Sequence, residues 1–194
     1  MCNVCCSPSV NCKSKSFLLF LLLIFLLGMA FCPQAHSAQA KVAYFAGGCF
    51  WCTEAVFEQA PGVTSVVSGY MQGAETIQIT FDPSKTSYDK LLNLFSRAHN
   101  PTEVDSQGPD VGKQYRSAIF YADDQQRAAA ERSKTQAPKS YSKPIATEIT
   151  RAGSFRPAPE NHQNFCRKKP KQSVRPTNYS TEAQETRSEV ALSY

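Results

Sequence analysis

The sequence predicts an α+β domain, a two-layer sandwich in which helices cover a mixed, mainly antiparallel sheet. Two observations lead to this prediction. Segments with the two-residue period of strands alternate with segments that have helical spacing. The link Met71–Ala74 between two strand-like runs is also short enough for a hairpin, which makes those strands antiparallel. With 194 residues and no internal repeat, the chain favours one domain.

The individual elements follow from periodicity and from the residues that interrupt it. Pro61-Gly62 ends the first helix, and residues 100–114 form a polar loop that contains proline and glycine. Strands are expected at residues 41–46, 63–70, 75–81, 115–121 and 144–149, and helices at 49–59, 84–98 and 123–136. After Arg151 the periodicity is lost, so no further element is predicted.

Residues 1–40 have the pattern of a signal peptide. Lys13 and Lys15 precede an apolar run, Phe17–Phe31, which is shorter than the roughly 20 residues of a membrane-spanning helix. Small residues at Ala38 and Ala40 then suit a signal peptidase. We expect an exported protein, periplasmic or extracellular, with its domain at residues 41–170 and a polar, disordered tail at 171–194. The alternative is an uncleaved leader that anchors the domain to the membrane.

Composition narrows the choice of function. Five of the eight cysteines lie in the leader, which leaves Cys49, Cys52 and Cys166. An odd number of cysteines in an oxidising compartment favours a reactive thiol over a disulfide framework. The net charge of +5 is modest, and the basic run at residues 167–171 lacks the interleaved aromatic residues of a nucleic-acid surface. We expect no nucleic-acid partner, membrane contact only through the leader, and a monomer.

Residues 47–52, with the sequence GGCFWC, are the sharpest feature of the chain. The two glycines allow a tight turn out of a strand. Cys49 then lies at a helix N-terminus, where free amide hydrogens and the helix dipole favour a thiolate. Cys52 follows on the same side of the first turn, and Phe50 and Trp51 can form an apolar wall.

Three other interpretations compete with a reactive thiol. Cys49 could be a core cysteine packed among aromatic residues. A zinc site would need more ligands, and the mature chain offers only Cys166, His99 and His162 at irregular spacing. We therefore predict no metal, and we expect both histidines to be structural. A thioredoxin-like dithiol also has Cys-x-x-Cys at a helix start, but GGCFW is not its usual motif.

The segment Gly48–Cys52 resembles the signature of the A-type peptide methionine sulfoxide reductases. The similarity covers roughly residues 42–170 and includes PGV at 61–63, VSGY at 67–70, AE at 74–75, FDP at 81–83, HNPT at 99–102, DVGKQYRS at 110–117 and HQ at 162–163. It implies reduction of methionine-S-sulfoxide, free or in proteins, for the repair of oxidised proteins. It also implies no bound cofactor and an external thiol reductant such as thioredoxin. The expected fold is ferredoxin-like.

The resemblance assigns catalytic roles to four residues. Cys49 attacks the sulfur of the sulfoxide, and Glu75 protonates its oxygen, for which partial burial would raise the pKa of the carboxyl. Tyr115 hydrogen-bonds the same oxygen, and Asp110 lies in the same motif. The reaction leaves a sulfenic acid on Cys49.

The remaining roles concern the substrate and the second half of the reaction. Phe50 and Trp51 would hold the substrate's methyl group. A second thiol would condense with the sulfenic acid to a disulfide. The spacing of three residues favours Cys52 as this resolving thiol, and Cys166 is the second candidate.

The chain also departs from the family pattern. The link before Glu75 lacks a longer loop whose tyrosine is a second hydrogen-bond donor to the sulfoxide oxygen. Ser96, Arg156 and Asn161 stand where aromatic residues are usual. A one-base shift in suitable codons for residues 178–188 would give an amphipathic segment, which suggests a frameshift near Thr177. The alternative functions are a catalytically impaired homologue that keeps the fold and a general thiol–disulfide oxidoreductase.

Overall fold

The structure is a computed structural model that describes residues 40–136 and 141–170. The predicted signal peptide, the polar tail and the proposed frameshift fall on residues 1–39 and 171–194, outside the described ranges. Within those ranges, no helix combines the length and the apolar character that crossing a membrane requires.

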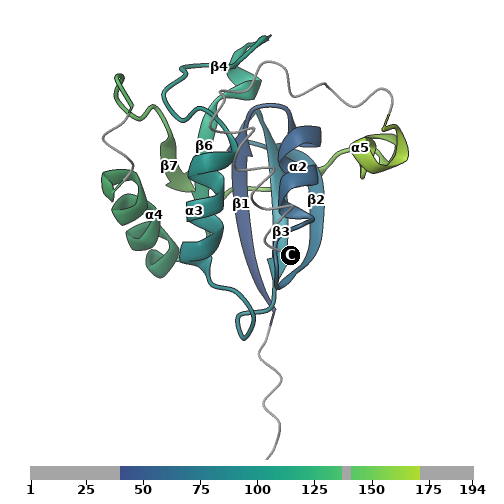
Figure 1. Cartoon of the computed structure of the whole chain (residues 1–194), viewed down its shortest axis with the longest axis horizontal. Coiled ribbons are helices and arrows are strands. Elements are labelled where there is room, and N and C mark those ends of the chain that lie inside the picture. Colours follow the sequence, from purple (N-terminus) through teal and green to yellow (C-terminus); the bar gives the residue numbers. More distant parts are fainter. Residues whose placement is uncertain (1–39, 137–140, 171–194) are drawn as a thin grey trace, which may run out of the picture. The chain divides into compact units, whose positions relative to one another are not determined.

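The domain is built on a six-stranded sheet with the order β7-β6-β1-β3-β2-β8 (Figure 1). Neighbouring strands are antiparallel except for the parallel pair β6 and β7. The strands are β1 (Lys41–Gly47), β2 (Val63–Met71), β3 (Ala74–Phe81), β6 (Ser117–Tyr121), β7 (Glu148–Arg151) and β8 (Arg156–Pro157).

The first part of the domain has the ferredoxin-like topology. Helix α2 (Phe50–Phe57) connects β1 to β2, and α3 (Tyr88–Ala98) connects β3 to β6. The resulting order β6-β1-β3-β2 is that of a split βαβ unit. The α+β class and the mainly antiparallel sheet are therefore confirmed.

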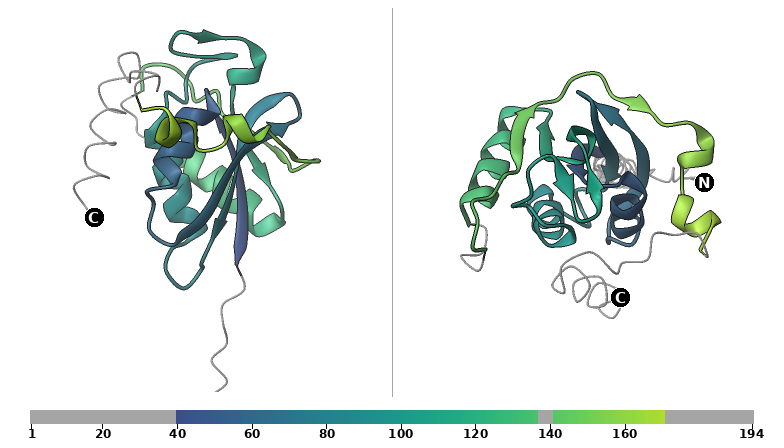
Figure 2. Two further views of the ribbon diagram at one scale, coloured as in Figure 1. Left: turned by 90° about the vertical axis from the view of Figure 1, so that its right-hand side faces the viewer. Right: turned by 90° about the horizontal axis from the view of Figure 1, so that it is seen from above.

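The two faces of the sheet are buried in different ways. Helices α2, α3 and α4 (Asp124–Gln136) cover one face (Figure 1). The ring of Phe45 on β1 packs there against Phe57 and Phe95 at centroid distances of 5.6 and 4.8 Å. The other face carries a smaller apolar cluster, covered in part by Ala152 and Phe155. The chain that leads from β7 towards α5 (Phe165–Lys168) runs along this face (Figure 2).

The link between β2 and β3 is a two-residue hairpin turn, as predicted. Met71 pairs with Ala74, and the left-handed backbone at Gln72 (φ 49°) and Gly73 (φ 77°) closes the turn between them. The guanidinium of Arg116 donates to the carbonyl of Gln72 at 3.0 Å, and the Gln72 side chain donates to the carbonyl of Arg151 at 2.8 Å. The turn is thus tied to two neighbouring segments.

Two predicted boundaries are wrong for local reasons. Helix α3 begins at Tyr88 rather than at residue 84, because the Asp82 side chain accepts from the Ser84 amide at 2.9 Å and holds a turn, and Ser87 then caps the helix. The strand expected at 144–149 lies at Glu148–Arg151, since Ala146 is bonded to the carbonyl of Pro101 instead of to the sheet.

Several short elements were not predicted. The loop at 100–114 contains the paired strands β4 (Ser106–Gln107) and β5 (Asp110–Val111). The 3₁₀ helix η1 (Lys113–Tyr115) follows, so β6 begins at Ser117 and not at residue 115 as predicted. Strand β8, η2 (Glu160–His162) and α5 follow residue 151. These pieces have two to four residues each, too few to produce a periodic pattern.

Candidate active site

Cys49 lies where the end of β1 turns into α2. Gly48 has a φ of 88°, which an L side chain rarely adopts. A Cβ on Gly47 would lie 3.0 Å from the ring of Phe95 and 3.3 Å from that of His99, so a larger residue would fit only if these rings moved. Cys49 is the N-cap residue of α2 and is 7% exposed. The predicted strand–turn–helix setting of this thiol is therefore present.

Glu75 points at the same helix start from the neighbouring strand. Its carboxyl oxygen accepts a hydrogen bond of 3.0 Å from the backbone N–H of Phe50. Burial raises the pKa of Glu75, the Phe50 N–H opposes that rise, and the charge of Asp110 adds to it. A carboxyl with a raised pKa thus lies beside Cys49.

The thiol of Cys49 does not have the lowered pKa that its helix position predicts. Its pKa is raised, mainly by the neighbouring Cys52 thiol and then by burial, and the charge of Glu75 adds to the rise. The backbone N–H of Trp51 acts in the opposite direction. The expectation of a resting thiolate is wrong because these effects outweigh the helix N-terminus.

Aromatic rings surround the first turn of α2. The ring of Phe50 lies 5.5 Å from that of Tyr70 and 6.0 Å from that of His162, measured between centroids. The ring of Trp51 stacks on Phe165 at 3.8 Å and 10°, and on His162 at 5.6 Å. Phe50, which is buried, and the half-buried Trp51 therefore lie in one aromatic cluster with three further rings, and the apolar wall for a substrate stays a prediction.

Asp110 and Tyr115 reach the site from the β4–β6 segment. Asp110 is half-buried on β5, burial raises the pKa of its carboxyl, and its charge acts on Glu75. Tyr115 is half-buried at the end of η1, which packs against β3, the strand that carries Glu75. The structure thus places Asp110 close enough for its charge to act on Glu75. It places Tyr115 beside β3, the strand that carries Glu75.

Both candidate resolving thiols lie near the first turn of α2, Cys52 within that helix and Cys166 on α5 beside it. Cys49, Cys52 and Cys166 are all outside disulfides. Cys52 interacts directly with the Cys49 thiol. Cys166, on α5, donates from its sulfur to the carbonyl of Trp51 at 3.4 Å. The structure therefore places Cys52 next to the nucleophile and Cys166 beside the same helical turn.

A segment at residues 158–169, which we call the C-terminal strap, lies against α2 and β2. The side chain of Gln163 accepts from the Ser68 N–H at 2.9 Å and donates to the carbonyls of Ser68 and Ala158, each at 2.8 Å. The backbone N–H groups that begin α5 act on the carboxyl of Glu54, which is 1% exposed. Sequence reasoning missed Glu54, whose signal is an acid inside an otherwise apolar helix.

Two of the three histidines, His99 and His162, lie in the described part of the chain, and neither belongs to a possible metal cluster there. His99 is buried, with hydrogen bonds to the carbonyl of Phe95 (2.8 Å) and the hydroxyl of Ser117 (2.7 Å). Burial lowers the pKa of His99 to about 4, so the ring is neutral, and its predicted structural role is confirmed. Among residues 40–136 and 141–170, no group of three His, Cys, Asp or Glu side chains could hold a metal ion.

The positions that depart from the family pattern are not buried. Ser96 is half-buried, and its carbonyl accepts from the hydroxyl of Tyr141 at 3.3 Å. Arg156 and Asn161 are exposed. Ser96 also lines a small cavity with apolar side chains of the core, whereas Arg156 and Asn161 lie at the surface.

A ferredoxin-like domain with a thiol and a protonatable carboxyl at one helix start defines a thiol-dependent oxidoreductase. Comparison with known families makes the class specific. The family model described as peptide methionine sulfoxide reductase matches residues 41–75 and 72–192. The chain belongs to this family and is an enzyme that reduces methionine sulfoxide. The two matched parts overlap at residues 72–75, in the turn between β2 and β3 and the start of β3.

Individual relatives agree with this assignment. Peptide methionine sulfoxide reductase MsrA 1 of Rhodopirellula baltica is 44% identical over 147 residues, which are 67% of this chain and 77% of that protein. The reduced form of Mxr1 from Saccharomyces cerevisiae superimposes with a TM-score of 0.69 at 29% identity, covering 73% of this chain and 92% of that chain. Mxr1 in complex with Trx2 shares the fold at 24% identity, with a TM-score of 0.54 and coverage of 70% and 91%.

Proposed function

We propose that the chain reduces the S epimer of methionine sulfoxide with Cys49 as nucleophile and Glu75 as acid. The observation that supports this most directly is the 3.0 Å hydrogen bond from the Phe50 N–H to the Glu75 carboxyl, next to the Cys49 thiol. Sulfoxide oxygen leaves only when protonated, so thiol and acid must act at one place.

In this proposal Glu75 handles two protons, its own and that of Cys49. The raised pKa of Cys49 keeps its proton on sulfur in the resting enzyme. When the sulfoxide binds, Glu75 passes a proton to the oxygen and takes up the one that Cys49 gives up. The thiolate attacks the substrate sulfur, the S–O bond breaks and the hydroxyl moves to Cys49. Methionine leaves reduced by two electrons, and Cys49 becomes a sulfenic acid.

The second half of the reaction regenerates the thiol. The thiol of Cys52 attacks the sulfur of the sulfenic acid, a disulfide forms and water leaves. Cys52 is favoured because its thiol already interacts with Cys49. Cys166 is the further thiol, whose exchange with the new disulfide would release Cys49. We propose a thioredoxin-type dithiol as the external reductant, as the Trx2 complex of Mxr1 suggests for that protein.

The remaining roles in the proposal concern substrate and oxygen. Phe50 and Trp51 hold the methyl group, since their rings lie together in the aromatic cluster beside Cys49. Tyr115 donates to the oxygen, and Asp110 favours the protonated form of Glu75 through its charge. The hairpin turn leaves no tyrosine at the position of the family's second donor. In other enzymes, the loss of one such donor raises the activation free energy by about 2.7 to 4 kcal/mol. We therefore expect slower turnover.

Separate S and R epimers of a doubly blocked methionine sulfoxide test the proposal. With dithiothreitol as reductant, the full chain should release methionine from the S epimer only, and Cys49→Ser should abolish release. A folded protein without turnover would favour the catalytically impaired homologue. Insulin reduction without sulfoxide turnover would favour a general thiol–disulfide oxidoreductase.

We also propose that the protein is exported. The support is the basic and apolar pattern of residues 1–40 with small residues at Ala38 and Ala40. N-terminal sequencing of the expressed protein tests the proposal. A mature chain that begins near Lys41 supports it, and an intact N-terminus would favour an anchored protein instead.

A further inference from the structure

Three side chains from neighbouring strands form a row on the sheet face that carries α2. Glu75 on β3 pairs directly with Tyr70 on β2, and Tyr70 pairs directly with Arg156 on β8. Directly opposed residues of antiparallel strands place their side chains on the same face, about 4.5–5.5 Å apart at Cβ. The row therefore begins at the proposed acid and ends at an exposed cation.

Ring contacts connect this row to the catalytic turn. The Tyr70 ring lies 5.5 Å from that of Phe50, which follows the nucleophile in the chain. The guanidinium carbon of Arg156 lies 4.7 Å from the centroid of the same Tyr70 ring. The Tyr70 ring thus lies between Phe50 and Arg156 and contacts both. The cation–π contact restricts the arginine side chain.

The backbone that carries Arg156 is fixed in register. A Cβ on Gly69 would lie 2.5 Å from the carbonyl oxygen of Arg156, so β8 lies against β2 as closely as a glycine allows. The Ala158 N–H donates to the carbonyl of Ser68 at 2.9 Å, and Gln163 closes the same junction. The guanidinium is therefore held by a strand whose position the fold determines.

We propose that Arg156 is a specificity-determining residue that binds a carboxylate of the substrate near the sulfoxide. Among the described residues, no ion pair to Arg156 exists, and its guanidinium is exposed beyond the Tyr70 ring. Arginine binds carboxylates through two parallel N–H donors. The ligand is either the α-carboxylate of free methionine sulfoxide or an acidic side chain next to it in a peptide. The inference rests on the proposed function.

Steady-state kinetics on matched S-sulfoxides test the inference with the full chain. The first pair is N-acetylmethionine sulfoxide and its methylamide, which differ only in the α-carboxylate. The second pair consists of two blocked peptides that are identical except for the residue after the sulfoxide, which is Asp in one and Asn in the other. We expect kcat/KM to favour the carboxylate member of at least one pair by about fivefold, expressed in KM rather than kcat. Which pair shows the preference identifies the source of the carboxylate.

Variants attribute the preference to one side chain. Arg156→Gln should remove it, Arg156→Lys should keep part of it, and Arg151→Gln, a matched change of an exposed arginine on β7, should keep all of it. High ionic strength should weaken the preference in the parent chain.

Two results would overturn the inference. One is turnover of all four substrates by the parent without preference for a carboxylate, which would leave the proposed function intact. The other is a preference that Arg156→Gln does not change. A parent that turns over no sulfoxide would instead contradict the proposed function, and the inference with it.

Discussion

The backbone N–H of Phe50 donates to the carboxyl of Glu75 across 3.0 Å, and this contact joins the start of α2 to the start of β3. It has a chemical consequence, because Phe50 directly follows Cys49. The carboxyl is held beside the thiol by the backbone and not by a mobile side chain. Burial then raises the pKa of Glu75, which is the direction of shift that a proton donor needs.

Replacing Glu75 by Gln should lower kcat for the S-sulfoxide by about 100-fold or more, because the amide cannot supply a proton. Its carbonyl can still accept from the Phe50 N–H, so the urea unfolding midpoint should change little. Glu58→Gln, on the half-buried residue that ends α2, is the matched control and should keep full activity. Turnover of Glu75→Gln within threefold of the parent would show that another group provides the proton.

Removing Cys52 should make Cys49 more reactive in the resting enzyme. The Cys52 thiol is the main cause of the raised pKa of Cys49, so Cys52→Ala should increase the thiolate fraction at pH 7. Iodoacetamide alkylation of Cys49, followed by peptide mass spectrometry, should therefore be faster in the variant and should reach half its maximal rate at lower pH. An unchanged pH profile would mean that burial alone sets the pKa.

Removing the acceptor of Glu54 should loosen the C-terminal strap. The Glu54 carboxyl interacts with the backbone N–H groups of Asn164 and Phe165, and leaving such buried donors unpaired costs about 1–3 kcal/mol. We expect Cys166 to be alkylated about tenfold faster in Glu54→Leu, which cannot accept a hydrogen bond, since that cost makes local opening easier. Cys166 should react at the parental rate in Glu58→Leu. Equal rates in all three proteins would contradict a role for Glu54 in holding the strap.

Stability should depend on pH through His99. Its pKa is about 4 in the folded chain and 6.5 as the reference value, so the unfolded chain binds the extra proton between these values. The contribution is fully present above pH 6.5, and about 3 kcal/mol of unfolding free energy should be lost as the pH falls to 4.

Urea unfolding at several pH values measures this effect against His99→Gln. The buried carboxyls with raised pKa values contribute the opposite slope in both proteins, so the difference between parent and variant isolates the histidine. A difference that stays constant from pH 7 to pH 4 would mean that folding does not lower the pKa of His99.

The sequence predicted the long elements and the position of the thiol because their signals are local. The glycines before Cys49, the hairpin link and the amphipathic face of α3 each act within a few residues. The strap and its contacts could not be predicted in this way. Gln163 bonds to Ser68 across 95 positions, and Arg156 meets Tyr70 only because β8 adds to the edge of the sheet.

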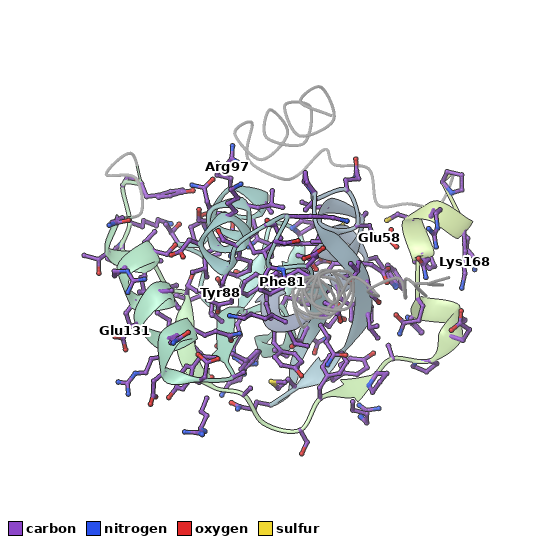
Figure 3. The ribbon with its side chains drawn as sticks, turned by 90° about the horizontal axis from the view of Figure 1, so that it is seen from below. Glu58, Phe81, Tyr88, Arg97, Glu131 and Lys168 are labelled. Atoms are coloured by element: carbon purple, nitrogen blue, oxygen red, sulfur yellow. The ribbon has the colours of Figure 1, made fainter. Side chains whose placement is uncertain are left out.

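The protonation state of Cys49 is the instructive failure. Position at a helix N-terminus predicts a thiolate, and the structure keeps that position. The opposing effect comes from the closeness of Cys52, which is visible in the sequence, and from burial, which is not. Figure 3 shows Glu131 on α4, a helix that the sequence predicted, and Lys168 on α5, which it did not, at opposite sides of the domain.

Trapping of the sulfenic acid tests the central claim most directly. In a Cys52→Ser/Cys166→Ser double variant, which lacks both candidate resolving thiols, reduced and then freed of reductant, the S epimer of a blocked methionine sulfoxide and dimedone should together yield one blocked methionine and one dimedone adduct per chain, on Cys49. The R epimer should give neither. Methionine release without an adduct on Cys49, or equal labelling by both epimers, would contradict the proposed chemistry.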